Sequence, residues 1–352
     1  MTENVSEQLE RLLRSTHPYP QPGSGFDPMT ASNVELAGFG LPERPDATTA
    51  PEHFRFWQAM LKPPNTFVAP VFPTADELIK GRDEHELDLH GIHAPLLRQV
   101  HHRRSSRNWS GAYITPIPRP NRFMQMAGTW TVPQPEVPRV QPSGTDRTDE
   151  QYHSSTWIGI GGQRSYNSLP QIGTHQHVIV RNGHATPKIE AWWQWWIKNR
   201  PGHHISIPIE NFEVRIGDEI LASLTVEAPW PGEVRFNIKN QCTGVLVCFK
   251  TGSPAGIMPL GSTVEWVHER STKPSGDVMY ALPRCTDVQF NDCLAWSAPE
   301  FGMPMVLQKL HQNARLIRMA EHFDDPHRSA LVSLPERLND TSLSIKYKEA
   351  GG

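Results

Sequence analysis

The sequence predicts an all-β protein, a sandwich or barrel of short strands, preceded by a partly helical and proline-rich N-terminal extension. Proline accounts for 33 of the 352 residues, roughly twice the ~5% of an average protein, and proline this dense disfavours a helical bundle. Ten of the 11 Trp lie at or after Trp109. From there on, short apolar runs alternate with polar residues and are separated by turn sequences, a pattern typical of antiparallel sheets.

Composition and charge exclude several classes of protein. The chain has no run of 18 apolar residues, so we expect no membrane-spanning helix and no membrane partner. The net charge of -3 argues against a nucleic-acid partner. The polar start MTENVSEQLERLLRS lacks the apolar core of a secretory signal, so we expect a cytoplasmic location, with a non-standard export route left open. The sequence does not indicate an oligomeric state.

The chain divides into two regions, which we predict to be an N-terminal extension over residues 1–107 and a β-sandwich domain over residues 108–352. In the extension, apolar spacing predicts helices over residues 5–15, 51–61 and 74–84, joined by extended proline-rich linkers. The extension ends in the basic cluster HHRRSSR at residues 101–107. Two hypotheses follow: an inhibitory prosegment whose cations meet carboxylates of a groove, or a permanent packing arm. We favour the packing arm, because no secretory route is visible.

Period-two alternation predicts strands over residues 220–226, 234–239, 245–250 and 341–348. In the second of these, apolar residues alternate with Arg235, Asn237 and Lys239, which predicts one buried face and one wet or functional face. The mixed stretch before the last strand predicts a helix over residues 305–323.

The densest aromatic motif is IEAWWQWWIKNRP, which starts at Ile189. On a strand, Glu190, Trp192, Gln194 and Trp196 share one face, and the remaining indoles share the other. A row of carboxylate, amide and two indoles fits the lining of a groove for a peptide or a sugar chain. The alternative is packing on both faces of the strand, and we favour the groove.

A second motif, STVEWVHERS from Ser262, predicts a strand with Glu265, Val267 and Glu269 on one face. A carboxyl flanked by Val and Trp is costly to bury unless it is protonated or hydrogen-bonded. We therefore expect a raised pKa for Glu265, which suits a general base or acid. From the residues alone, an exposed Glu on an edge strand is the favoured interpretation.

A third motif, SLPQIGTHQHVIV from Ser168, contains an isolated amide, Gln171, that is able to donate to a developing oxyanion. Further along the same strand, His175 and His177 point the same way and form half of a metal site. A third ligand such as His153 or His184 is needed, and nothing in the sequence fixes its position. We therefore expect neither a metal site nor a cofactor.

The four cysteines, Cys242, Cys248, Cys285 and Cys293, allow three pairings if they are oxidised. Their spacing does not match a zinc knuckle. We favour buried free thiols.

A series of motifs together resembles the glutamic peptidases, or eqolisins. Each motif alone is weakly specific, but they occur in the family's order between residues 108 and 347. They are NWSGAY at Asn108, GTWTVPQP at Gly128, SSTWIGIGG at Ser154, LPQIGT at Leu169, EAWWQWW at Glu190, IENFEVRIGDEI at Ile209, VEWVHE at Val264 and DVQFNDC at Asp287.

The resemblance implies a concanavalin A-like sandwich of two curved antiparallel sheets, with an endopeptidase active site on the concave face and a polypeptide as substrate. The catalytic residues of the family correspond to Gln171 in LPQIG and Glu265 in VEW. In that mechanism the Glu carboxylate activates a water, and the Gln amide stabilises the oxyanion. The residues that match the family's substrate groove are Trp109, Trp157, Glu190, Trp192 and Gln194.

The chain departs from the family's pattern at two acidic positions beside the catalytic pair. Gly161 stands where the family's WVGIDG motif has an acidic residue, and Gln194 replaces the carboxylate of AWYEW. The loss of two negative charges should lower the pKa of Glu265 relative to the family. It predicts an activity optimum nearer neutral pH, and it leaves a weak or inactive enzyme open.

Two other function classes remain open at this point. One is a β-sandwich glycoside hydrolase that uses two carboxylates, Glu190 and Glu265, across a Trp-lined cleft. The other is a non-catalytic module that binds carbohydrate or peptide on the row of indoles. The glutamic endopeptidase is the prediction that accounts for both Glu265 and Gln171.

Overall fold

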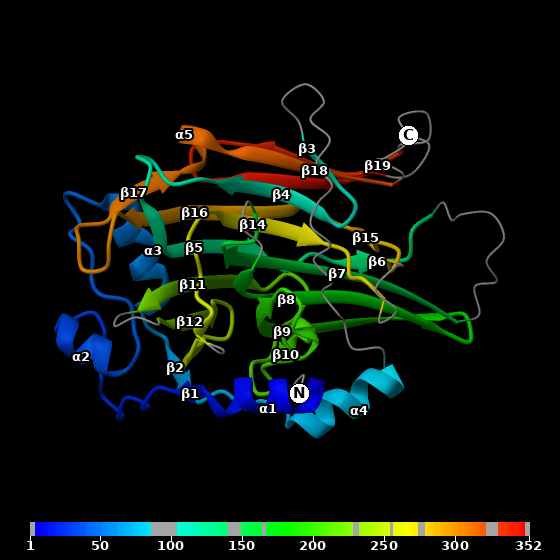
Figure 1. Ribbon diagram of the computed structural model, residues 1–352, viewed down its shortest axis with the longest axis horizontal. Coiled ribbons are helices and arrows are strands. Elements are labelled where there is room, and N and C mark those ends of the chain that lie inside the picture. The colour runs from blue at the N-terminus through cyan, green and yellow to red at the C-terminus, as the bar shows by residue number, and fades with distance from the viewer. Residues whose placement is uncertain are drawn as a thin grey trace.

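A computed structural model describes residues 4–85, 104–139, 149–163, 167–227, 232–253, 256–273, 279–321 and 330–348. The architecture is a sandwich of two antiparallel sheets, with helices along one edge and one side (Figure 1). The predicted all-β fold is confirmed. No helix within these ranges is long and apolar enough to cross a membrane.

Sheet I carries the motifs quoted above, and its central strands pair antiparallel in the order β10-β9-β8-β7-β14-β4-β18. β3 and β19 also pair with β18. The strands of sheet I are β3 (Arg104–Ser106), β4 (Trp109–Ile114), β7 (Asp149–Ile160), β8 (Ser168–Arg181), β9 (His184–Ile197), β10 (Ile207–Pro208), β14 (Val264–Glu269), β18 (Arg315–Glu321) and β19 (Ala330–Arg337).

Sheet II runs in the order β16-β5-β11-β12-β13, with β17 and β20 also paired to β16. β19 pairs with β20, so the two sheets are continuous at this edge. The strands of sheet II are β5 (Arg122–Thr131), β11 (Glu219–Glu227), β12 (Glu233–Asn240), β13 (Val245–Thr251), β16 (Val288–Ala298), β17 (Val306–Lys309) and β20 (Leu343–Tyr347). A separate small sheet pairs β6 (Pro135–Glu136) with β15 (Arg284–Cys285).

The main core lies between the two sheets, where their inner faces bury apolar side chains from alternate positions. Trp266 of β14 is fully buried there, and its indole Nε1 donates to the Ala127 carbonyl of β5 at 2.9 Å. Trp193 of β9 packs against Phe236 and Phe249 of sheet II. The alternation that fills this core turns the intervening side chains of sheet I toward its outer face.

The N-terminal extension packs against sheet II and adds strands to its edge. β1 (Thr16–Pro18) pairs antiparallel with β13, and β2 (Thr66–Val68) pairs parallel with it. Its helices are α1 (Val5–Arg14), α2 (Asn33–Gly38), α3 (Pro51–Leu61) and α4 (Ala75–His85). In Figure 1, α1 and α4 lie side by side along one edge of the sandwich, and α2 and α3 lie beside sheet II.

These helices begin where their sequences provide capping groups. Asn4 and Ser32 form capping boxes with the Glu three residues later, and Pro51 opens α3. The predicted helices over residues 5–15, 51–61 and 74–84 are confirmed, while α2 was not predicted. The division of the chain at residue 107 stays a prediction.

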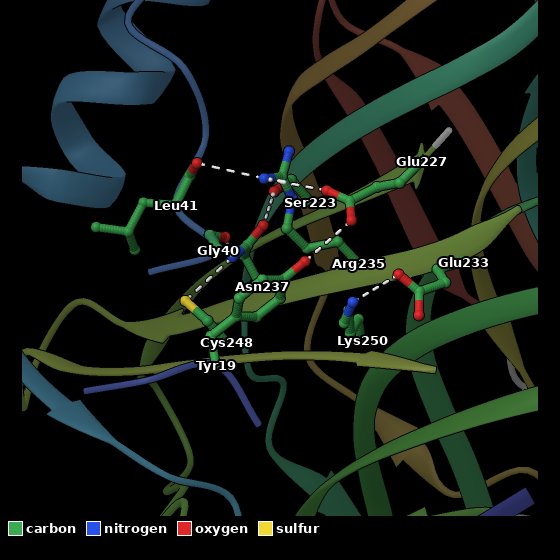
Figure 2. A network of polar contacts seen from close by, with 10 residues as sticks. All are labelled: Tyr19, Gly40, Leu41, Ser223, Glu227, Glu233, Arg235, Asn237, Cys248 and Lys250. Atoms are coloured by element: carbon green, nitrogen blue, oxygen red, sulfur yellow. Dashed lines mark hydrogen bonds and ion pairs between the residues drawn. The ribbon is translucent and has the colours of Figure 1, made fainter. Parts of the chain in front are cut away.

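The polar face of β12 lies beneath the extension rather than in water. Arg235 donates to the Leu41 carbonyl, and Asn237 donates to the Gly40 carbonyl at 2.8 Å (Figure 2). Lys239 donates to the carbonyls of Ala59 and Lys62 at 3.0 and 3.2 Å. The prediction of a wet or functional face on this strand was therefore wrong, because the extension supplies backbone acceptors for its donors.

The helix predicted over residues 305–323 was also wrong. This stretch forms β17, the short helix α5 (Leu310–Asn313) and β18. β17 pairs with β16, and β18 pairs with β3 and β4, so strand pairing overrides the local helical preference.

All four cysteines are free. Three of them are buried as predicted, whereas Cys242 is exposed.

Candidate active site

A row of directly paired residues crosses the outer face of sheet I. Glu265 of β14 is in register with Tyr113 of β4 on one side and with Gly159 of β7 on the other. Gly159 is in register with Gln171 of β8, which is itself opposite Gln194 of β9. Paired residues on neighbouring strands share one face of a sheet, so this row brings together the two predicted catalytic residues.

Glu265 is completely buried, and its two carboxyl oxygens differ in environment. The backbone N–H of Gln163 donates to Oε1 at 3.1 Å, whereas Oε2 has no hydrogen-bond partner among the described residues. Burial raises the pKa of Glu265 to about 8, although hydrogen bonds from Thr263 and from the backbone of residues 161–163 oppose this effect. The predicted upward shift of the pKa is therefore confirmed in direction. The favoured interpretation of Glu265 as an exposed residue on an edge strand was wrong, because β14 pairs with β4 on one side and β7 on the other.

The Gln171 and Gln194 side chains are both fully buried and bonded to each other. Gln171 Nε2 donates to Gln194 Oε1 at 2.5 Å. Gln171 Oε1 and Gln194 Nε2 have no hydrogen-bond partner in the described part of the chain. An amide nitrogen carries two protons, so Gln171 keeps a second N–H for another acceptor.

Gly159 separates Glu265 from Gln171, and it contributes no side chain between them. A Cβ at this position would lie 2.7 Å from Leu169 Cδ1 and 3.0 Å from Trp157 Cζ3. The Leu169 and Trp157 side chains therefore already pack over Gly159, and the carboxyl and the amide lie on the same face of the sheet on either side of this strand.

Indole rings border the row on the same face of the sheet. Trp109 and Trp157 meet edge to face, with ring centroids 5.0 Å apart. Trp157 Nε1 donates to Glu269 Oε2 at 2.9 Å, and Asn108 Nδ2 donates to Glu269 Oε1 at 2.7 Å. Glu269, two residues beyond Val267 on β14, thus fixes the orientation of Trp157.

The other two indoles lie on β9, on either side of Gln194. Trp192 stacks on His175 and Trp196 stacks on His204, with centroid distances of 4.9 and 5.2 Å. Trp192 and Trp196 belong to one apolar cluster with Trp109 and Trp157, so the predicted shared face of IEAWWQWW is confirmed. Trp192, Gln194 and Trp196 are, however, as buried as the indoles on the opposite face, so β9 is packed on both faces and the substrate groove stays a prediction.

The comparisons with known proteins agree with this geometry. Residues 107–305 match the peptidase A4 family. The chain belongs to this family. Family membership makes it a glutamic-type endopeptidase, or eqolisin. Aspergillopepsin-2 of Aspergillus niger is 24% identical over 229 residues, which cover 62% of this chain and 72% of that protein.

One solved structure shows the same fold. Scytalido-glutamic peptidase with a transition state analog inhibitor superposes with a TM-score of 0.50 at 18% identity. The match covers 69% of this chain and 98% of that chain. Aspergilloglutamic peptidase from Aspergillus niger matches with a TM-score of 0.39 at 20% identity, over 56% of this chain and 99% of its own. The β-sandwich predicted from the sequence motifs is therefore shared with an eqolisin structure.

The five residues predicted to line the groove of this eqolisin lie on one face of sheet I, but one of them, Glu190, lies away from the row. Trp109, Trp157, Trp192 and Gln194 lie in or beside the row. Glu190 lies further along β9, opposite His175, and forms an ion pair with Lys188 at 2.9 Å.

Histidines gather around Glu190 on this face of sheet I. His175, His177 and Glu190 have ligand atoms that all lie within 4.8 Å of one another. His153 stacks on His177 and on Tyr280, while the exposed His184 at the start of β9 lies outside the cluster. The third member of the group is therefore Glu190, rather than His153 or His184.

Sequence reasoning missed two parts of the eqolisin site. The backbone N–H of Gln163 holds Glu265 Oε1, and Gly159 lets Leu169 and Trp157 pack closely against the strand between the catalytic candidates. Both lie in or just after the segment SSTWIGIGG, whose glycines were the available signal. Glycines directly after a strand permit turns in which backbone N–H groups converge on an anion.

Proposed function

We propose that Glu265 and Gln171 form the catalytic pair of this endopeptidase, which hydrolyses peptide bonds of unfolded polypeptides without a metal or cofactor in the chemical step. The observation that carries the proposal is the row Glu265–Gly159–Gln171, which places the carboxyl and the amide on one face of sheet I with a single strand between them. Each of the two side chains has a buried polar atom without a hydrogen-bond partner in the described chain. Unpaired atoms of this kind are costly to bury unless a ligand uses them.

Glu265 is suited to act as the general base. Its Oε1 is anchored by the Gln163 N–H, so the free Oε2 has a fixed direction. In the first step, ionised Glu265 takes a proton from water through Oε2, and the water oxygen attacks the scissile carbonyl carbon.

Gln171 is suited to stabilise the charge that this attack creates. The carbonyl oxygen becomes an oxyanion, and the second N–H of Gln171 Nε2 donates to it. The Gln194 carbonyl holds the first N–H, which fixes the plane of the Gln171 amide. The amide is therefore oriented before the substrate arrives.

Collapse of the tetrahedral intermediate completes the reaction. Protonated Glu265 gives its proton to the leaving nitrogen, the C–N bond breaks, and the products are a carboxylic acid and an amine. One carboxyl thus serves first as base and then as acid. The indoles of Trp109, Trp157 and Trp192 form a buried apolar cluster beside the row.

The glycoside hydrolase hypothesis requires two carboxyls about 5–9.5 Å apart. Glu190 lies four residues from Gln194 along β9, which is about 13 Å at ~3.3 Å per residue. It is also in an ion pair with Lys188. Glu190 therefore does not form such a pair with Glu265. Family membership likewise favours a peptidase over a binding module without chemistry.

An assay on denatured protein substrate tests the catalytic pair. We expect Glu265→Gln to lower kcat/KM by roughly 10²–10⁴ and Gln171→Ala by roughly 10²–10³. The matched controls are Glu336→Gln and Gln289→Ala, which change a carboxyl and an amide on exposed positions of β19 and β16. Full activity of either catalytic-pair variant, with the controls also active, would overturn the proposal.

The pH dependence of kcat/KM gives a second test. The base must be ionised, so activity should rise with pH through the pKa of Glu265, which burial sets near 8. At pH 7 roughly a tenth of the free enzyme then carries the base form. We expect an activity maximum near neutral pH or above, and a profile over pH 2–9 that peaks well below pH 4 would contradict it.

A further inference from the structure

The end of the groove distant from the catalytic row contains a cluster of metal-ligating side chains. His175 and His177 stand two residues apart on β8, and Glu190 on β9 is directly opposite His175. Their ligand atoms lie within 4.8 Å of one another. The two imidazoles are buried, while the Glu190 side chain remains 23% exposed. An ion can therefore approach from the side of Glu190.

His175 is held in a fixed orientation by groups around it. Its Nδ1 is 2.7 Å from Ser155 Oγ, and its Nε2 is 3.1 Å from Ser206 Oγ. Its ring also stacks on Trp192 with an interplanar angle of 12°. Whichever ring nitrogen binds a metal ion, the other keeps a serine hydroxyl that orients the ring, as is usual for metal-binding histidines.

The charge of Glu190 is balanced by a side chain that is able to leave. Lys188 Nζ is 2.9 Å from Glu190 Oε2, and the lysine side chain is 49% exposed. A lysine this exposed can swing into water when a cation takes its place. Lys188 is therefore a competitor for the carboxylate and not a permanent partner of it.

We propose that His175, His177 and Glu190 bind one Zn²⁺ ion at the end of the groove and that the bound ion blocks long polypeptides. Two imidazole nitrogens and one carboxylate oxygen form a common ligand set for zinc, with the fourth position left for water. Tetrahedral bonds of ~2.0–2.1 Å separate ligand atoms by about 3.3 Å. Closing from 4.8 Å requires His177 and Glu190 to move toward His175, which exchanges one of its two serine contacts for the ion.

The position of the site determines its effect on the enzyme. His175 lies four residues from Gln171 along β8, about 13 Å at ~3.3 Å per residue. This distance excludes the ion from the catalytic step, but an extended polypeptide bound in the groove would meet it about four residues from the scissile bond. The inhibitory effect rests on the proposed function, whereas metal binding does not.

Metal binding is measured directly on the full chain, without turnover. Titration calorimetry with Zn²⁺ and visible absorption with Co²⁺ should both report one ion per chain. We expect His177→Gln and Glu190→Gln each to weaken binding more than tenfold, since each removes a ligand. Lys188→Met should strengthen it several-fold, because a competing cation is lost. The matched control His184→Gln, an exposed histidine on the same hairpin, should bind as the wild type does.

Zn²⁺ binding that is absent from the wild type, or equal in His177→Gln and Glu190→Gln, would overturn the site. Activity then tests the consequence. Zn²⁺ should inhibit cleavage of denatured protein by the wild type, a chelator should restore it, and His177→Gln should resist inhibition. Binding without inhibition would overturn the blocking role alone. Loss of all turnover in metal-free wild type would instead count against the catalytic pair.

Discussion

The outer faces of the two sheets both bury polar side chains, but they differ in how those side chains are hydrogen-bonded. On sheet II the N-terminal extension covers β12, where Asn237 and Lys239 donate to backbone carbonyls of the extension. On sheet I the catalytic row is equally buried, yet Glu265 Oε2 and Gln171 Oε1 have no hydrogen-bond partner in the described chain. On the covered face Arg235 Nε also has no partner in the described chain, but the Asn237 and Lys239 donors are paired with the extension. On sheet I the unpaired atoms belong to the two candidate catalytic residues, where a ligand could use them.

The difference shows that burial of polar residues does not by itself identify a functional face. A buried donor that meets a backbone acceptor stabilises the fold, because leaving it unpaired would cost about 1–3 kcal/mol. A buried carboxyl or amide that keeps a free atom is retained at a cost in stability, which is typical of active sites. Changes on the sheet II face should therefore alter stability alone, and changes on the sheet I face should alter stability and turnover together.

The largest expected effect comes from Trp57→Ala in α3, which tests the covered face. Trp57 is fully buried between the extension and sheet II, and its Nε1 donates to the Pro42 carbonyl at 2.9 Å. Loss of the ring and of this bond should lower the free energy of unfolding by about 4–5 kcal/mol. Denaturant unfolding measures this, and kcat of the folded protein should be unchanged. A cost below about 1 kcal/mol would show that the extension is not part of the folded unit.

The second effect is a pH-dependent gain of stability in Glu265→Gln. The pKa of Glu265 is raised from 4.5 to about 8 in the folded protein, so the folded state holds this proton more tightly than the unfolded state does. Its contribution to stability is complete below pH 4.5 and is lost as the pH rises through about 8. At pH 9 the Glu265→Gln variant should therefore be more stable than the wild type, by at most about 5 kcal/mol.

Unfolding at pH 5, 7 and 9 checks this prediction, with the exposed Glu336→Gln as the matched control. The control should show a difference from the wild type that does not vary with pH. If the stability difference between Glu265→Gln and the wild type is also independent of pH, the fold does not hold the Glu265 carboxyl in its neutral form. The proposed contrast between the two outer faces would then be wrong for Glu265.

Many helices and strands were predictable because the spacing of apolar residues within each segment determines its secondary structure. The strands β11, β12, β13 and β20 and the helices α1, α3 and α4 follow directly from apolar spacing. β17 and β18 were not predictable from spacing, since their strand conformation depends on pairing with distant partners. The burial of Arg235 beneath the extension was likewise not predictable, because its acceptor Leu41 lies 194 residues away in the sequence.

The face on which each site residue lies was predictable for residues of one and the same strand. Alternation puts Glu265 and Glu269 on one face, and the same rule puts Trp192 and Gln194 on another. What the sequence left open was the register between strands, which aligns Glu265 with Gln171 through Gly159. Register depends on pairing across the whole sheet, and a shift of one residue would turn each side chain to the opposite face.

The third effect comes from Gly159→Ala, which adds a methyl group where other side chains already pack between the catalytic candidates. The added Cβ would lie 2.7 Å from Leu169 Cδ1, 3.0 Å from Trp157 Cζ3 and 3.1 Å from the Pro170 carbonyl oxygen. Overpacking of this kind costs about 1–3 kcal/mol, and displacement of Trp157 or of the row should lower kcat/KM at least tenfold. The control Gly23→Ala has no atom within 4 Å of the new Cβ. Equal activity in both variants would show that the row tolerates a side chain at its centre.

The smallest effect comes from Tyr19→Phe on the covered face, and it tests whether the two faces are independent. The Tyr19 hydroxyl donates to Glu227 Oε2 at 3.0 Å (Figure 2). Burial and the charge of Glu227 raise the pKa of Tyr19 above its usual value, so this bond persists throughout the pH range in which the enzyme is assayed. Loss of this hydrogen bond should lower the free energy of unfolding, measured in urea, by about 1 kcal/mol.

Tyr19 is separated from the catalytic row by the core between the two sheets, so kcat and KM of Tyr19→Phe should equal those of the wild type. A changed pH profile of kcat/KM in Tyr19→Phe would mean that the extension also influences Glu265, and the outer faces would then have to be treated as one coupled system.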